Sequence, residues 1–527
     1  MLRALTSARG AVTAPHHLAA QAGASVLRDG GNAVEAMVAA AATIAVVYPH
    51  MNSIGGDGFW LISRPGQAPV GIEACGRAAG LATPGWYRDA GHGAIPSRGP
   101  LAANTVAGAV SGWQAALEQA GGRLPLGRLL RDAIGHAQGG TVVTQSQVDY
   151  TKKFLAELGT QPGFGDVFLR DGQLTIAHSL QRFAALAATL QRLARRGLDD
   201  FYRGETAQAM AAELERLGSP LRLDDLQRHH ASVVQPLEVE LSVGRAFNMP
   251  PPTQGVASLM ILGLFDRIRE GVRADSFDHV HRLVEATKQA FLVRNRSVCD
   301  PAAMKVDAAS FLREDALAPR AAAIDLARAR AWPEPAIKGD TVWMGAADAD
   351  GCMVSYIQSV YWEFGSGVVL ADTGINWQNR GASFSLDDSS HLVLAPGRKP
   401  FHTLNPALAR LADGREMVWG NMGGDGQPQS QAAVFSRYAM FGQDLQQAVS
   451  APRWLLGRTW GQMSVGLKIE GRFDPALIAA LKAAGHDVDV VEAYSDLVGH
   501  AGALVRQPDG VVFGAADPRS DGTVAML

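Results

Sequence analysis

Two strand-like runs near the middle of the chain constrain its fold more than any other segment. In "TVWMGAADADGCMVSYIQS", from Thr341 to Ser359, half-alternating apolar residues flank a tight Asp-Ala-Asp-Gly turn. Two such runs around a short turn that contains Gly are typical of a β-hairpin. The stretch just before it, from Arg313 to Asp340, is rich in Ala, Arg and Pro and is expected to be exposed. The chain therefore presents Thr341 at the head of a hairpin, directly after an irregular segment.

The composition is that of a globular protein and gives no sign of a polyanionic partner. Of 527 residues, 47% are hydrophobic and 19% are charged, which is enough for one large core or for two to three domains. The formal net charge of -3 provides no electrostatic attraction to nucleic acid or to an anionic membrane. We therefore expect neither of these partners, and expect a small-molecule substrate instead.

Cysteine usage and the amino-terminal residues indicate a reducing compartment. Cys75, Cys299 and Cys352 show no paired spacing, so neither a disulfide framework nor a zinc site is expected from them. The amino-terminal stretch contains no apolar core of signal-peptide length. The apolar stretch from Ala36 to Pro49 is shorter than the roughly 20 residues that span a bilayer, so it predicts a buried helix. We therefore expect a cytoplasmic protein.

The histidines do not suggest a metal enzyme. The pairs His16-His17 and His229-His230 are adjacent in sequence, and adjacent residues do not lie on one helix face as paired metal ligands do. We expect neither a metal nor another cofactor.

The remaining patterns predict a mixture of helices and strands. Residues 16–47 predict two helices interrupted at Gly30-Gly31, with Asn32 as the N-cap of the second. Residues 120–330 are mostly helical in pattern, with strands between 235 and 255 that end at a Pro-rich turn. From Asp340 onward strands dominate, with helices expected within 428–440 and 474–485.

A threonine hydroxyl in the middle of a chain needs a neighbouring base before it can act as a nucleophile. Cleavage of the peptide bond before Thr341 would supply one, because the freed α-amine would lie beside the hydroxyl of the same residue. The exposed stretch that ends in Gly339-Asp340 suits such a cleavage. A threonine that simply opens a strand is the commoner case, so the residues alone leave both interpretations open.

Several blocks spread along the whole chain resemble the γ-glutamyltransferase family. They are "GGNAVEAMVAAAATIAVVYPHMNSIGGDGFWLI", "TVAGAVSGW", "DDFYRGE", "PPPTQGVASLMIL", "HRLVEATKQAFLVRNR", "APRW" and "GAADPRSDG", in the family's order. The resemblance implies an N-terminal-nucleophile hydrolase with an α+β fold, a four-layer αββα sandwich. It also implies self-cleavage between Asp340 and Thr341 into a large chain (1–340) and a small chain (341–527) that form one intertwined domain.

The resemblance also assigns the catalytic groups. Thr341 matches the family's nucleophile, and its freed amine would be the general base. Ser359 matches a second hydroxyl residue eighteen positions further on, which is able to hydrogen-bond to the nucleophile. Gly423 and Gly424, in "WGNMGGDGQPQ", match the glycine pair whose N–H groups face the developing oxyanion.

The substrate-binding positions depart from the family pattern on the side that holds an α-ammonium group. In "WQNRGASFSLD", Ser383 stands where the family has an ammonium-binding aspartate, and Arg380 lies three residues before it. Tyr361 replaces an asparagine that also lies near the ammonium in the family. An arginine repels an ammonium group, and the loss of the aspartate removes a charge-assisted bond. We infer that the substrate has no α-amino group.

On the carboxylate side, the family's two serines are replaced by His402 and Thr403, which can still donate hydrogen bonds. Arg77, in "EACGRAAG", matches the family's carboxylate-binding arginine, although Cys75 and Ala78 stand where its acidic neighbours are expected. The pocket is thus expected to be cationic and to be crowded by aromatic residues. These aromatic residues are Trp343, Tyr361, Trp362 and Trp377.

A small acidic amide without an amine suits such a pocket, and oxamate is the best match. "SVYWEFGSGVVL" and "NRGASFSLD" are most similar to the oxamate amidohydrolase branch of the family, which makes oxalate and ammonia in purine catabolism. A γ-glutamyl hydrolase or transferase acting on glutathione-like substrates and a glutaryl-type acylase remain alternatives, as does a non-catalytic binding protein. The resemblance further implies that the two cleaved chains form a heterodimer, and that two heterodimers can pair.

Overall fold

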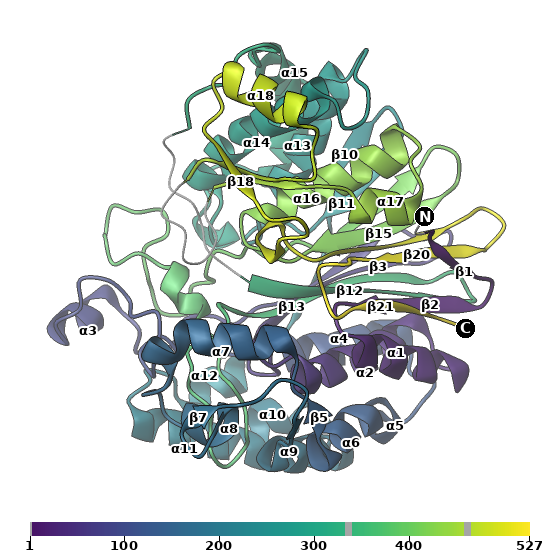
Figure 1. The fold of residues 1–527 in the computed structure, drawn as a ribbon. Helices are drawn as coiled ribbons and strands as arrows, with labels where there is room; N and C mark the ends of the chain where they lie inside the picture. Colours follow the sequence, from purple (N-terminus) through teal and green to yellow (C-terminus); the bar gives the residue numbers. More distant parts are fainter. Residues whose placement is uncertain (1–2, 333–339, 458–464) are drawn as a thin grey trace.

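The fold is known from a computed structural model that describes residues 3–332, 340–457 and 465–527. Within these ranges, two seven-stranded sheets lie face to face, and helices cover the outer face of each (Figure 1). This arrangement is the four-layer αββα sandwich expected from the sequence.

The first sheet combines strands from both ends of the chain and from its middle. Its strands, in spatial order, are β1 (Leu5–Ser7), β20 (Val512–Ala516), β19 (Ala501–Arg506), β15 (Glu416–Asn421), β14 (Ala407–Leu411), β11 (Gly244–Asn248) and β10 (Leu237–Leu241). All the neighbouring pairs described in this sheet are antiparallel.

The second sheet has the expected hairpin near its centre. Its strands, in order, are β21 (Thr523–Met526), β2 (Gly10–Ala14), β12 (Asp340–Asp348), β13 (Met353–Tyr361), β3 (Asp57–Ser63), β4 (Val70–Ala74) and β9 (Ser232–Val234). Both sheets therefore contain strands from before and after residue 340.

Two groups of helices enclose the sheets (Figure 1). The group next to the second sheet includes α1 (His17–Arg28), α2 (Ala33–Val47), α4 (Ala109–Ala120), α6 (Arg131–Gly139), α7 (Gln145–Leu158), α9 (Ala184–Arg196) and α11 (Glu205–Leu217). The group next to the first sheet includes α13 (Gly255–Ile268), α14 (Phe277–Ser297), α15 (Glu314–Ala322), α16 (Gly426–Phe435), α17 (Leu445–Ser450) and α18 (Pro475–Ala483).

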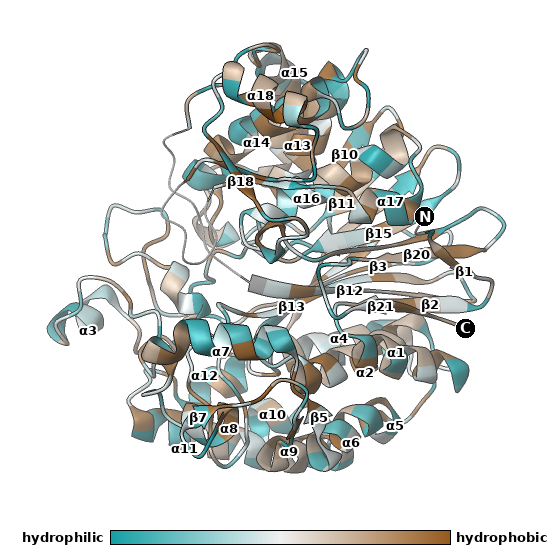
Figure 2. Cartoon of the chain, viewed as in Figure 1, coloured by the Kyte–Doolittle hydropathy of each residue, from teal (hydrophilic) through white to brown (hydrophobic). Residues whose placement is uncertain are grey.

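The hairpin strands are apolar on both faces because each face is buried. Val342 and Met344 point into the core between the second sheet and its helices, whereas Trp343 and Ala347 point into the core between the two sheets. Successive side chains of a strand point to opposite faces, so a strand buried on both sides loses the simple polar–apolar alternation. In Figure 2, the strands are mostly brown or white, and teal residues gather on outer helices such as α6 and α7.

The predicted break between the first two helices is confirmed. Helix α1 ends at Arg28 and α2 begins at Ala33, with Asn32 as N-cap. The Asn32 side chain accepts hydrogen bonds from the N–H groups of Val34 and Glu35, and the Glu35 carboxylate accepts one from the Asn32 N–H. This reciprocal capping box satisfies N–H groups that a helix start otherwise leaves without partners.

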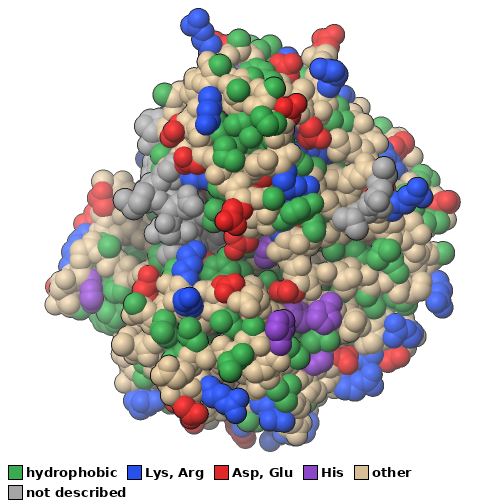
Figure 3. Space-filling view, in the orientation of Figure 1, with side chains coloured by type: hydrophobic (Ala, Val, Ile, Leu, Met, Phe, Trp, Pro, Cys, Tyr) green, Lys and Arg blue, Asp and Glu red, His purple; other side chains and the backbone are tan. Residues whose placement is uncertain are grey.

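Neither the surface charge on one face nor the described helices by themselves indicate a membrane or polyanion partner. On the face shown in Figure 3, basic and acidic side chains are interspersed, without a large region of one sign. Among the described helices, none combines the length and apolar character that crossing a membrane requires.

The contact between the sheets gives a stability prediction for Gly420. A Cβ added there would lie 2.1 Å from Cδ1 of Trp343, a buried side chain fixed by a hydrogen bond from its Nε1 to Ser355 Oγ. We expect Gly420→Ala to lower the free energy of unfolding by about 1–3 kcal/mol, because overpacking displaces the indole. Chemical denaturation would measure the change.

The matched control is Gly135→Ala in α6, where an added Cβ meets nothing within 4 Å. Alanine is the better helix former, so this variant should be as stable as the unaltered protein or more stable. Equal stability of Gly420→Ala and the unaltered protein would contradict the tight packing between the sheets.

Candidate active site

Thr341 lies at a bulge where the two hairpin strands change register. Asp340 pairs with Tyr361, but Val342 pairs with Gln358, so Thr341 faces two residues of β13, Ser359 and Val360. β-Bulges are common beside active sites because they redirect a side chain. The Thr341 side chain is buried, and its Oγ1 accepts a hydrogen bond of 3.1 Å from Nε2 of Gln427.

Gly423 and Gly424 connect strand β15 to helix α16, whose first turn contains Gln427. Both have positive φ angles, 108° and 45°, which residues with a side chain rarely adopt. The Gly423 carbonyl accepts a bond from the N–H of Gly426, and the Gly424 carbonyl accepts one from Nε2 of Gln254. The glycine pair therefore lies at the amino end of α16, where helical N–H groups and the helix dipole stabilise negative charge.

A buried ion pair supports this turn from beneath. Nη1 of Arg294, from α14, lies 2.7 Å from Oδ1 of Asp425 and 2.8 Å from Oε1 of Gln254. Gln254 Nε2 in turn donates to the carbonyls of Gly424 and Thr403. One network thus fixes the glycine turn and the segment that contains His402 and Thr403.

Ser359 lies on β13, opposite Thr341. It is fully buried, and its Oγ accepts a hydrogen bond of 2.7 Å from the N–H of Tyr361. Tyr361 itself has a φ of 83°, a left-handed conformation that costs a residue with a side chain about 1–3 kcal/mol. Such strain is common at functional sites, and here it occurs where the bulged strand leaves the sheet.

Arg380 is buried with most of its guanidinium unpaired. Nη1 lies 3.4 Å from Thr403 Oγ1, and the guanidinium carbon lies 4.1 Å from the centre of the Tyr361 ring. Within the described residues, Nε and Nη2 have no hydrogen-bond partner. Burial lowers the pKa of Arg380 to about 10, which leaves the group charged at neutral pH. The structure thus brings together Arg380, Tyr361 and Thr403, as the sequence predicts.

Ser383 ends the short turn that begins at Arg380, and its hydroxyl is bonded to the backbone. Its Oγ donates to the carbonyl of Phe401, at 3.3 Å. The position thus supplies a neutral hydroxyl already engaged with the backbone. Nothing in this contact replaces the charge-assisted bond of an aspartate to an ammonium group.

Asp57 and His402 form a second buried pair next to Arg380. Oδ1 of Asp57 accepts hydrogen bonds from the N–H groups of Gly76 and Gly108 and from Nε2 of Gln378. Its Oδ2 lies 3.5 Å from Nε2 of His402. Burial raises the pKa of Asp57 to about 7, and burial with the nearby Arg380 charge lowers the pKa of His402 well below its usual value.

Arg77 lies in a different environment from Arg380. Its side chain is exposed, and Nη1 donates to the carbonyl of Gly397 at 2.9 Å. It lines a hollow of about 420 Å³ together with Cys75 and with Lys399, which forms an ion pair with Glu73. Cys75 also raises the pKa of Arg380 through an electrostatic interaction, so the hollow lies next to the buried group of Arg380, Asp57 and His402. A role of Arg77 in binding remains a prediction.

Of the four aromatic residues expected in the pocket, Tyr361 lies against Arg380. Trp343 is a core residue between the sheets, packed on Gly420 and Gly502. Trp377 belongs to the core below the second sheet, and its Nε1 donates to the carbonyl of Thr105. The sequence interpretation treated these tryptophans as pocket residues because the sequence does not show which core each side chain enters.

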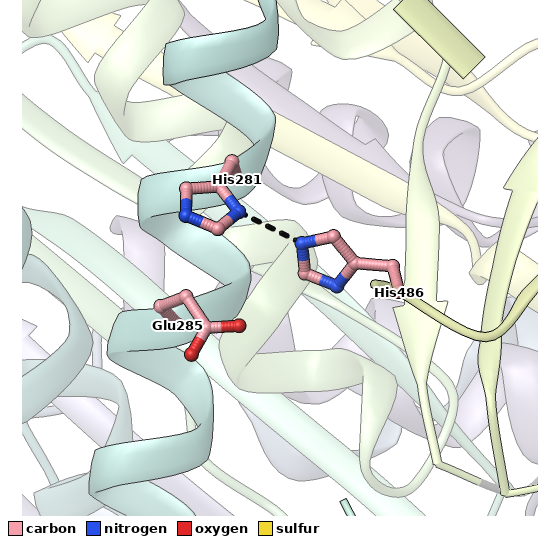
Figure 4. A group of neighbouring side chains, drawn as sticks. All are labelled: His281, Glu285 and His486. Atoms are coloured by element: carbon pink, nitrogen blue, oxygen red, sulfur yellow. Dashed lines mark hydrogen bonds between the residues drawn. The ribbon is translucent and has the colours of Figure 1, made fainter. Parts of the chain in front are cut away.

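The part of the chain that the structure describes also contains a histidine–glutamate group outside this site. His281 and Glu285 project from α14, and His486 follows α18 (Figure 4). His281 Nδ1 and His486 Nε2 share a hydrogen bond of 2.8 Å, and Glu285 pairs with Lys288 at 2.6 Å. The Glu285 carboxylate also accepts the N–H of Arg330, so its oxygens are already occupied by donors. We interpret this group as an anchor for residues 325–332.

Comparison with known proteins confirms the family. A γ-glutamyltranspeptidase family model matches residues 19–527. The chain belongs to the γ-glutamyltranspeptidase family. It is 55% identical to an oxamate amidohydrolase proenzyme from Klebsiella pneumoniae, over 98% of each chain. It is 38% identical to a glutathione hydrolase-like proenzyme from Bacillus subtilis, over 100% of each chain.

A solved structure shows the same fold. The cephalosporin acylase from Bacillus halodurans superposes with a TM-score of 0.90 at 31% identity, covering 100% of this chain and 97% of the acylase. The curated relatives are named as proenzymes of hydrolases. The predicted family, fold and enzyme class, a hydrolase, are therefore confirmed.

Several buried polar residues of this family member had no role in the sequence interpretation. All five lie inside sequence blocks quoted for the family resemblance; they are Asp57, Gln254, Arg294, Asp425 and Gln427. The blocks could have drawn attention to these polar residues. Which atoms face one another depends on strand pairing and helix placement, so sequence alone could not assign their contacts.

The buried Arg294–Asp425 pair gives a second stability prediction. Arg294→Met would leave the Asp425 carboxylate buried without its cation, so we expect the free energy of unfolding to fall by about 3–5 kcal/mol. The exposed pair Arg245–Glu240 is the control, and Arg245→Met should change stability by about 0.5 kcal/mol or less. Equal effects of the two substitutions in urea denaturation would contradict the supporting role of the buried pair.

Proposed function

We propose that the chain is a self-processing amidohydrolase that uses Thr341 to hydrolyse oxamate to oxalate and ammonia. More generally, its substrate is a small acidic amide without an α-amino group. Oxamate and water supply all atoms of the products, which are oxalate and ammonium at neutral pH.

The observation that carries the proposal is the unpaired, buried guanidinium of Arg380. Nε and Nη2 point the same way in an arginine and match the two oxygens of one carboxylate. Both atoms are buried without a protein partner among the described residues, and Thr403 adds a hydroxyl beside Nη1. A buried cation of this kind favours binding of a carboxylate and disfavours binding of an ammonium group. The 55% identity to a protein named oxamate amidohydrolase supports the same choice.

The mechanism starts with cleavage of the Asp340–Thr341 bond, which converts Thr341 into a chain terminus. Its amine would then remove the proton of its own hydroxyl as the oxygen attacks the amide carbon. The N–H groups of Gly423 and Gly424, at the start of α16, would stabilise the oxyanion. The amine would pass its proton to the leaving nitrogen, and water would then hydrolyse the ester on Thr341. The bond from Gln427 to Thr341 Oγ1 supports this placement of the nucleophile beside α16.

Ser359 would orient the Thr341 hydroxyl. It lies on the strand opposite Thr341 and would hydrogen-bond to the nucleophile once the chain is cut. His402 would contribute to carboxylate binding together with Thr403 and Arg380, and Arg77 would attract the anion from the hollow.

Cleavage would give a large chain of residues 1–340 and a small chain of residues 341–527. Because both sheets contain strands from both parts, the two chains would stay associated as one domain. The proposal includes pairing of such heterodimers, a cytoplasmic location and a role in purine catabolism. It involves no cofactor, no nucleic acid and no membrane.

A glutaryl-type acylase is the second candidate. The hollow beside the buried cluster, about 420 Å³ and lined by Arg77 and Lys399, could hold the carboxylate of a longer acyl group. The structural likeness to a cephalosporin acylase favours this alternative. The glutathione hydrolase-like relative supports a γ-glutamyl substrate as a further alternative.

A side-by-side assay on processed protein separates these functions. Ammonia release from oxamate would be compared with anilide release from a glutaryl anilide and from a γ-glutamyl anilide. Turnover of oxamate alone would support the proposal. Turnover of the glutaryl anilide alone would support the acylase, and turnover of the γ-glutamyl anilide would show that the protein binds an α-ammonium group.

The nucleophile has its own test. We expect Thr341→Ala to remain one uncut chain of 527 residues without activity, because both cleavage and turnover need the hydroxyl. Thr341→Ser is the control, since it keeps the hydroxyl and should still be cut. Intact mass spectrometry distinguishes the two forms, and a Thr341→Ala chain that is still cut at that bond would refute the assignment.

The carboxylate-binding arginine can be tested by a conservative change. Arg380→Lys keeps the charge but loses the paired Nε and Nη2 donors, so kcat/KM for oxamate should fall about 100-fold. Arg77→Lys is the comparison. If Arg77→Lys costs more than Arg380→Lys, the substrate carboxylate lies in the hollow and the acylase becomes the better assignment.

A further inference from the structure

The buried charges near Arg380 are balanced before any substrate binds. Arg380 and Asp57 are both fully buried. The Arg380 charge lowers the pKa of Asp57, and the Asp57 charge raises the pKa of Arg380. The neighbouring charged pair, Lys399 with Glu73, is also neutral as a unit. An ionised Asp57 therefore compensates the Arg380 charge in the absence of substrate.

A substrate carboxylate would upset this balance. Its arrival at Arg380 would place two negative groups, itself and Asp57, around one cation in a buried site. An uncompensated charge in such a site is strongly unfavourable, and buried groups usually respond by changing protonation. A proton taken up near Asp57 would restore neutrality.

The structure contains a place for that proton. Oδ2 of Asp57 and both ring nitrogens of His402 are buried and have no hydrogen-bond partner among the described residues. Oδ2 and Nε2 face one another at 3.5 Å, and the His402 ring is held edge-on by Phe59. Oδ1 is already occupied by three N–H donors. A proton on this pair would join two groups that otherwise lack a full hydrogen bond.

Other titratable groups face the pair from the elements packed around it, and none is better placed to take the proton. Among the described residues, five titratable groups interact electrostatically with Asp57 or His402. They are Arg380, Lys399, Cys75, Tyr202 and Tyr356. Arg380 and Lys399 are already protonated at neutral pH. Burial raises the pKa values of the Cys75 thiol and of both tyrosines, so these three groups are also protonated.

We infer that binding of the substrate carboxylate at Arg380 is coupled to uptake of one proton by the Asp57–His402 pair. The inference rests on the proposed function, because it requires an anionic substrate at Arg380. Asp57 and His402 act here as positioning residues that adjust the charge of the site, without contact to the scissile bond.

The sign of the pH dependence follows from this coupling. Since burial raises the pKa of Asp57 to about 7, the unliganded pair loses its proton as the pH rises through neutrality. Above that pH, binding must first restore the proton, so affinity for a monoanion should fall roughly tenfold per pH unit. Below it, the proton is already present and affinity should change little.

Calorimetry on the mature, processed enzyme tests the inference. The probe is pyruvate, a monoanion with the shape of oxamate and a methyl group in place of the amide nitrogen. Titrations at pH 8 in phosphate and in Tris, whose ionisation enthalpies differ, give the number of protons taken up per molecule bound. We expect close to one.

Two asparagine variants make the measurement specific. Asp57→Asn keeps an Oδ1 acceptor for the three N–H donors but cannot take up a proton, so uptake should fall close to zero. Asp348→Asn is the matched control at the far end of β12. Its buried carboxylate also accepts two backbone N–H bonds and has a pKa raised by burial, yet its replacement should leave the uptake close to one.

The outcomes separate this inference from the proposed function. If the enzyme hydrolyses oxamate but takes up no proton with pyruvate, the inference alone is wrong. The same holds if Asp57→Asn takes up as many protons as the unaltered enzyme. Failure to hydrolyse oxamate at any pH between 6 and 9 would refute the proposed function and the inference with it.

Discussion

The pairing of β12 with β13 is the interaction on which the rest of the site depends. The hairpin lies near the centre of the second sheet, and both of its faces are buried. A one-residue slip would exchange those faces, so packing against two cores fixes the register along the strands. Only at Thr341 does the register shift, and there the strand ends meet the amino end of α16. A rigid scaffold thus positions one irregular residue.

Arg380 is a buried cation whose Nε and Nη2 have no hydrogen-bond partner among the described residues. A guanidinium with unpaired donors destabilises a folded state because it has lost its water. The Tyr361 ring, the Thr403 hydroxyl and the Asp57 charge compensate only part of that loss. The donors that remain unpaired are the ones a ligand carboxylate would satisfy. Under the proposed function, the same donors would lower the stability of the fold and bind the substrate anion.

The site is assembled at the junction of the layers. Thr341 comes from the second sheet, the glycine turn follows a strand of the first sheet, and Arg294 contacts Asp425 of this turn from a covering helix. Gln254 links the glycine turn to Thr403. These hydrogen bonds restrict the glycine turn and the segment that contains Thr403, whereas Nε and Nη2 of Arg380 have no partner among the described residues.

Much of the fold was predictable because it is encoded locally. The break between α1 and α2 depends on the Asn32 cap and on neighbouring glycines, and the hairpin depends on a turn between two apolar runs. Family blocks predict site roles for Thr341, Ser359, Gly423, Gly424 and Arg380, and the structure brings Arg380 together with Tyr361 and Thr403. The sequence was misleading for Trp343 and Trp377, since an aromatic residue looks the same in a pocket and in a core.

By itself, the sequence determined the elements, the family and the residue types available for chemistry, because caps, turns and motif spacing act over short distances. Only the tertiary structure decided which atoms meet. It placed Arg380 in a buried site and Arg77 at an exposed hollow, and it brought Asp57 of β3 to His402, 345 positions further along the chain. Such pairings arise from the stacking of sheets and the burial of charge, which depend on the whole fold.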